Sequence, residues 1–77
     1  MNAERRSKVK DVIASLTRVV SSLERIIDQE QDALFNIPES FEGTDRYINS
    51  EDAIDTMEAA VEDLEEIIGK LETVCSK

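Results

Sequence analysis

Apolar residues recur in both halves of the chain in columns spaced seven residues apart. In the first half, the columns run through Val9, Leu16, Leu23 and Glu30; Val12, Val19, Ile26 and Ala33; and Ile13, Val20, Ile27 and Leu34. In the second half, they run through Ala53, Ala60, Ile67 and Val74; Ile54, Val61, Ile68 and Cys75; and Met57, Leu64 and Leu71. Residues with this spacing lie on one side of an α-helix. The pattern therefore predicts two amphipathic helices, each with an apolar stripe wide enough to face a protein core.

The first helix is predicted over residues 3–35, because residues that stop helices follow directly. Asn36 tolerates the left-handed conformation that often ends a helix. Ile37 precedes a proline and is disfavoured in the helical region, and Pro38 cannot continue a helix. We therefore expect the chain to leave the helix just after residue 35.

The second helix has two chemically reasonable starting points. Thr44 can cap a helix that begins directly after it, whereas Asn49 or Ser50 can cap a shorter one. One apolar column extends backwards to Tyr47 and favours the longer helix, over residues 44–76. Two helices of this length joined by a short connector are typical of an antiparallel hairpin. We therefore predict an all-α fold, with a single domain over residues 1–77.

The formal net charge of −9 is distributed unevenly along the chain. Residues 1–27 carry a net charge of +3, and residues 28–77 carry −12. Antiparallel pairing would place the basic start of the first helix beside the acidic end of the second. Exposed ion pairs contribute little individually, but together they favour this alignment over a parallel one.

Two helices cannot cover two wide apolar stripes by packing on each other alone. We expect the third column of each helix to stay partly exposed as an adhesive face. A second copy of the hairpin would cover it in a four-helix bundle, which predicts a homodimer. The alternative is that this face docks on a different protein.

The composition argues against most catalytic and metal chemistry. The chain has no histidine and one cysteine, so an internal disulfide and the usual zinc sites are not expected. Cys75 has no histidine to activate it as a nucleophile. Most carboxylates lie off the apolar columns, and the segment from Asp45 lacks the glycine and final glutamate of a calcium loop. We therefore predict a protein that is not an enzyme and that holds no cofactor or metal.

Charge and hydropathy also constrain the partners. No apolar run approaches the length of a membrane span, and no signal-peptide core is evident, so a cytoplasmic protein is expected. The acidic half would repel nucleic acids and anionic membranes. The partners expected are a second copy and a basic host protein.

The segment between the helices holds more than a chain reversal requires. Glu30 is the one charged member of an apolar column, and the three aromatic residues Phe35, Phe41 and Tyr47 lie nearby. The aromatic side chains could pack as a small cap over the hairpin end, or they could form an exposed anchor ringed by acids. Glu30 could reach water where the seam opens, or it could set the register or meet a basic partner. The candidate partner-binding residues are Glu30, Phe35, Glu39, Phe41, Glu42, Asp45 and Tyr47.

Residues 30–41 read EQDALFNIPESF. This segment resembles the central motif of small, acidic, mostly uncharacterised helical proteins of Firmicutes bacteria and their phages, roughly E-Q-E-A-aromatic-x-N-L-P-E-S-L. The similarity covers about residues 24–70, although the aromatic Phe35 falls one position later and Tyr47 stands where glycine is common. The resemblance implies a phage or prophage context and no enzymatic role, and it supplies no binding residues.

These observations predict a non-enzymatic interaction module that docks through an apolar helical face, in keeping with a phage-related accessory factor. The alternative is an acidic inhibitor that occupies the nucleic-acid-binding groove of a host protein, such as a defence nuclease. The two hypotheses differ in the surface used, because the first needs the apolar stripe and the second needs the carboxylates.

Overall fold

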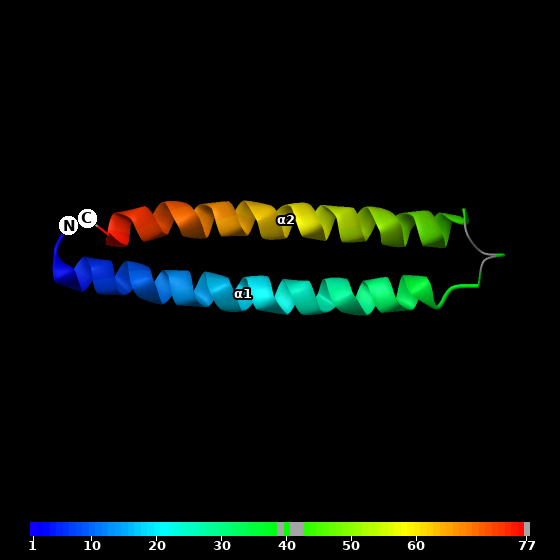
Figure 1. The fold of residues 1–77 in the computed structure, drawn as a ribbon, viewed down its shortest axis with the longest axis horizontal. Helices are drawn as coiled ribbons and strands as arrows, with labels where there is room; N and C mark the ends of the chain where they lie inside the picture. The colour runs from blue at the N-terminus through cyan, green and yellow to red at the C-terminus, as the bar shows by residue number, and fades with distance from the viewer. Residues whose placement is uncertain (39, 41–42, 77) are drawn as a thin grey trace.

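The computed structural model of the 77-residue chain describes residues 1–38, 40 and 43–76. Its elements are α1 (Ala3–Phe35) and α2 (Asp45–Cys75). They lie side by side and antiparallel, with both chain ends at one end of the molecule (Figure 1). The shape is a rod with principal extents of 60 × 15 × 13 Å. The predicted all-α hairpin is confirmed, α1 has the predicted bounds, and α2 is one residue shorter at each end than the predicted range 44–76.

The chain leaves α1 without a left-handed residue. Asn36 has φ −85° and ψ −1°, so the predicted left-handed conformation at this position is wrong. Its N–H instead donates to the carbonyl of Asp32 at 3.1 Å, as in one more helical turn. Pro38, two residues further on, ends the helix on its own. Among the described residues, positive φ occurs only at Gly43 (φ 83°), where glycine avoids the steric cost of a side chain.

The longer of the two predicted second helices is the one that forms. The Oγ1 atom of Thr44 accepts a hydrogen bond from the N–H of Tyr47 at 3.3 Å, which caps the helix start. Asp45 in the first turn places a carboxylate where the helix dipole favours it. The helix then continues unbroken through Asn49 and Ser50, the alternative caps.

Two of the three apolar columns on each helix make the contact between α1 and α2. The buried core consists of Val20, Ile27, Ile54 and Val61, with Leu23, Leu34, Met57, Leu64 and Ile68 packed against it. Along each helix these residues are separated alternately by three and four positions, which is the spacing of a coiled-coil seam. The hairpin therefore uses only a narrow seam, and no side chain in the described part is less than 2 % exposed.

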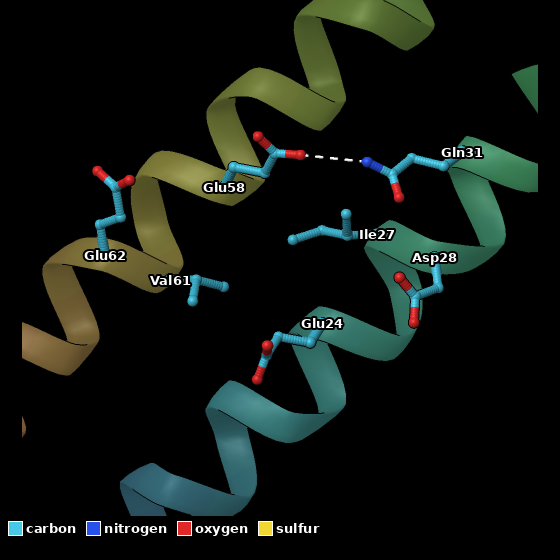
Figure 2. Close-up of a pocket in the computed structure, with 7 residues that line it drawn as sticks. All are labelled: Glu24, Ile27, Asp28, Gln31, Glu58, Val61 and Glu62. Carbon is cyan, nitrogen blue, oxygen red and sulfur yellow. Dashed lines mark hydrogen bonds between the residues drawn. The ribbon is translucent and has the colours of Figure 1, made fainter.

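The register of the two helices follows from the side chains that meet. Ile27 and Val61 approach each other across the seam (Figure 2). Nearer the loop, Leu34 and Ile54 line the same hollow. The levels at which the most buried columns of α1 and α2 meet therefore recur every seven residues, in opposite directions along the two helices.

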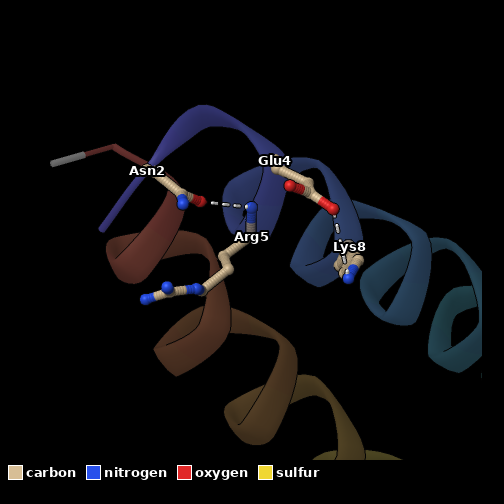
Figure 3. Close-up of polar contacts among 4 residues, drawn as sticks. All are labelled: Asn2, Glu4, Arg5 and Lys8. Carbon is tan, nitrogen blue, oxygen red and sulfur yellow. Dashed lines mark hydrogen bonds and ion pairs between the residues drawn. The ribbon is translucent and has the colours of Figure 1, made fainter.

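Hydrogen bonds and an ion pair stabilise the end of the hairpin that holds the two termini. Asn2 Oδ1 accepts from the backbone N–H of Arg5 at 2.8 Å and caps α1 (Figure 3). Glu4 pairs with Lys8 at 3.5 Å, one turn along the same helix (Figure 3). Across the hairpin, the Cys75 thiol donates to the carbonyl of Arg6 at 3.8 Å. Cys75 is half-buried, as expected for a small apolar residue in the last turn.

Among the described residues, the expected attraction between the basic and acidic ends does not produce ion pairs across the hairpin. In the described part of the chain, the ion pairs are Glu4 with Lys8 in α1 and Glu66 with Lys70 in α2. Each pair lies within a single helix and is largely exposed. Such pairs contribute about 0–1 kcal/mol each. The alignment of the helices therefore depends on the apolar seam.

Candidate interaction surfaces

The third apolar column of each helix is left outside the seam. On α1, Val12, Val19 and Ile26 are 49–51 % exposed, and on α2, Ile67 is 45 % exposed. Each of these residues comes one position before a residue of the more deeply buried column. A helix turns by about 100° per residue, so this offset places them beside the seam and not opposite it. The prediction that the third column stays partly exposed is confirmed.

The two exposed columns lie on the same face of the hairpin. In an antiparallel pair, equal offsets from the buried columns place residues of both helices on one side of the seam. The groove on the other side shows this directly, because it gathers Glu24 and Asp28 of α1 with Glu58 and Glu62 of α2. We call the opposite side the apolar face; it consists of Val12, Val19, Ile26, Ala33, Ala53, Ala60, Ile67 and Val74.

The groove side is acidic. The groove encloses about 330 Å³, and its polar lining consists of Glu24, Asp28, Gln31, Glu58 and Glu62 (Figure 2). Gln31 Nε2 donates to Glu58 Oε1 at 3.2 Å and links the two helices across it. No cationic side chain lines this groove among the described residues. We call this side the acidic face; its four carboxylates form a strip of negative charge over the seam.

Sequence reasoning did not single out the acidic face, although a signal for it exists. Glu51, Glu58, Glu65 and Glu72 recur every seven residues, in step with the apolar columns. A column of identical charges at this spacing predicts a charged helix face.

Of the two alternatives for the aromatic residues of the corner, Phe35 follows the exposed one. It is 90 % exposed and does not pack over the hairpin end. It directly follows Leu34 of the seam, and one step of about 100° turns it away from α2. Tyr47 is half-buried and Asp45 is exposed at the start of α2.

The remaining candidate residues of the corner are divided. Glu39, Phe41 and Glu42 lie outside the described residues. Among the described residues at the loop end, a hollow of about 450 Å³ is lined by Asn36, Ile37, Pro38, Thr44 and Arg46. The candidate partner-binding set is therefore not gathered into one site by the described part of the structure.

Glu30 lies in the seam column and is half-buried. Among the described residues, its side chain makes no hydrogen bond or ion pair, and in the seam pattern it falls between Ile27 and Leu34 of α1. A half-buried carboxylate brings less apolar area into the seam than the aliphatic residues of the same column. Glu30 therefore marks a weak layer of the seam.

The described residues contain neither a cluster of metal-binding side chains nor a membrane-spanning helix. No three acidic, histidine or thiol side chains converge closely enough to hold a metal ion. Neither helix has a stretch both apolar and long enough to cross a lipid bilayer.

Comparison with known proteins gives no family assignment. The chain matches no protein-family model, no curated protein and no solved structure.

Proposed function

We propose that the chain is a non-enzymatic interaction protein that docks through its apolar face, with a second copy of itself as the partner. The exposed aliphatic side chains of Val12, Val19, Ile26 and Ile67 carry this proposal. They extend along one side of the hairpin, whereas isolated apolar residues on a surface would be scattered over it. Packing two such faces together would complete a four-helix bundle.

The size of the exposed surface supports self-association. A compact monomer of this mass exposes about 4,700 Å², whereas the hairpin exposes 5809 Å². Its radius of gyration is 17.6 Å, against about 11.5 Å for a compact chain of this length. With four buried core residues in its described part, a two-helix rod of this kind gains most of its remaining stability by covering the apolar face.

The biological setting that we propose is a phage or prophage accessory factor. The resemblance of residues 30–41 to the loop motif of small phage and Firmicutes proteins supports it. An exposed helical face is a surface through which such a factor would bind another macromolecule.

Sedimentation or light scattering at several concentrations tests the proposed docking face. We expect a dimer at tens of micromolar, a monomer for Val19→Lys, and an unchanged dimer for the control Thr17→Lys. Thr17 lies on the other side of α1 and is exposed, so both variants add the same charge to the same helix. A parent protein that stays monomeric at high micromolar concentration would contradict self-association.

A second candidate function uses the acidic face. We propose as the alternative an acidic inhibitor that fills a basic, nucleic-acid-binding groove of a host protein. The carboxylates of Glu24, Asp28, Glu58 and Glu62 support it, because they form a strip without a cation in the groove lining. Such a strip complements a positively charged groove and speeds encounter with it.

The two candidate functions respond to different variants. If the acidic face binds a basic protein, Glu58→Gln with Glu62→Gln would weaken capture of that protein, and raising the salt concentration would weaken it steeply. Val19→Lys would leave this capture intact. Capture that is insensitive to salt and to the glutamine variants would count against the inhibitor function.

A further inference from the structure

We propose that two copies of the hairpin pack through their apolar faces with their loops at opposite ends of the bundle. This inference rests on the proposed function and adds the orientation of the partner. Two-fold stacking of one face on itself allows two arrangements, with the loops together or with the loops apart. Four features of the hairpin bear on this choice: its charge, the sizes of its apolar residues, the place of Glu30 and the area of the face.

The charge of the hairpin changes along its length. Leu23 and Leu64 pack against the core, and the register places them near the middle of the apolar face. The half that contains the loop, residues 23–64, holds thirteen acidic and two basic residues. The terminal half, residues 1–22 and 65–77, holds five acidic and seven basic residues. Loops at the same end would bring two halves of net charge −11 together, whereas loops at opposite ends place each beside a half of +2.

The side chains of the apolar face also become smaller toward the loop. Ile26 and Ala60 directly precede the facing residues Ile27 and Val61. Because the helices are antiparallel, the two residues are offset by about 3 Å along the axis, less than one helical turn, and they belong to the same level of the face. Steps of seven residues extend this register in both directions. From the terminal end to the loop end the levels are Val12 with Val74, Val19 with Ile67, Ile26 with Ala60, and Ala33 with Ala53.

This gradient of side-chain size suits opposite orientations. With the loops together, the alanine level of one copy would face the alanine level of the other and leave a void, which is unfavourable. With the loops apart, Val12 faces Ala33 of the second copy, and Val74 faces Ala53 of the second copy. The layers then combine large with small side chains and differ less in volume than they would with the loops together.

Glu30 gives a further reason. It is half-buried and belongs to the seam column that borders the apolar face. With the loops together, the two Glu30 carboxylates would lie at one level of a largely apolar interface. With the loops apart, they are about 22 Å from each other along the bundle, at 1.5 Å per residue. The second arrangement avoids burying two like charges side by side.

The apolar face is large enough for a specific dimer. From Val12 to Ala33 it is about 32 Å long, and two helices side by side are about 20 Å wide. Two copies would therefore bury about 1,200–1,300 Å² in total, at the lower end of specific interfaces. We expect a dimer that dissociates measurably at micromolar concentrations.

Distances between spin labels test the orientation. Ser76→Cys and Asn36→Cys, each in a Cys75→Ser background, place a label at the terminal end or at the loop end. With the loops apart, a dimer labelled at either position gives a distance of about 40 Å, and a mixture of the two labelled proteins adds a distance of about 10–15 Å. Short distances at both single positions would overturn the orientation while leaving self-association intact. Sedimentation that shows only monomer would overturn both proposals.

A substitution on the apolar face gives a second test that needs no label. With the loops apart, Ala33→Val overfills the layer that contains Val12 of the second copy, and we expect the dimer dissociation constant to rise about tenfold. Adding Val12→Ala to the same chain should restore most of the affinity. With the loops together, Ala33→Val would fill a void and tighten the dimer, which would contradict the proposal.

Discussion

The two sides of the seam are built by the same rule and carry opposite chemistry. The apolar face contains the residues one position before the buried columns, and the acidic face contains residues on the other flank of the same seam. Both faces combine α1 and α2 residues that are far apart in the sequence. The seam fixes the side of the hairpin on which a residue lies, and the residues beside the seam decide what that side can bind. One scaffold can therefore present two independent surfaces.

The largest expected effect is on the stability of the hairpin, and it distinguishes Ile27 of the seam from its neighbour Ile26 of the apolar face. Ile27 is 7 % exposed and Ile26 is 49 % exposed. We expect Ile27→Ala to lower the free energy of unfolding by about 2–5 kcal/mol, because it removes buried methyl groups and leaves a cavity. Urea denaturation followed by circular dichroism measures this loss.

Ile26→Ala is the matched control, with the same change one residue away. We expect it to alter the unfolding free energy of the monomer by less than about 1 kcal/mol. Its main effect should appear in the dissociation constant of the dimer. Equal destabilisation of the monomer by both variants would show that the apolar face belongs to the hairpin core.

The second prediction concerns the one charged layer of the seam. Glu30→Leu replaces a half-buried carboxylate that lacks a partner in the described part of the chain. We expect it to stabilise the hairpin by about 1–2 kcal/mol, since the burial of an aliphatic side chain replaces the unfavourable burial of a carboxylate. Thermal unfolding measures the gain, and Gln29→Leu, at an exposed neighbouring position, serves as the control. A destabilised Glu30→Leu protein would indicate that the carboxylate holds a partner or the register.

The smallest predicted effect comes from variants on the acidic side of the seam. The contact of Gln31 with Glu58, extended by seven residues, places Glu24 level with Glu65. Glu65→Lys would replace like charges with opposite ones and stabilise the hairpin by up to about 1 kcal/mol. Glu65→Gln, which only removes the charge, should give about half of this gain. Thermal unfolding at low and high salt checks both values, and a gain that persists at high salt would exclude an electrostatic cause.

The local chemistry of the sequence determined most of the fold. Pro38 ends α1, Thr44 caps α2, and the seven-residue columns predict both helices with their bounds. These features act within a few residues of the chain, so they can be recognised without knowing what packs where. The surplus of apolar columns was recognisable for the same reason, because a narrow seam covers only two columns.

Tertiary packing decided which columns meet and what each face became. On either helix, two choices of neighbouring columns give the same alternating spacing of three and four residues. The structure selects the pair that puts Leu34 and Ile54 in the seam and leaves Ala33 and Ala53 outside. Larger side chains bury more apolar area, and this burial stabilises the hairpin only when the two helices pack against each other. The same rotation turns Phe35 into solvent and gathers glutamates of α1 and α2 into one acidic face.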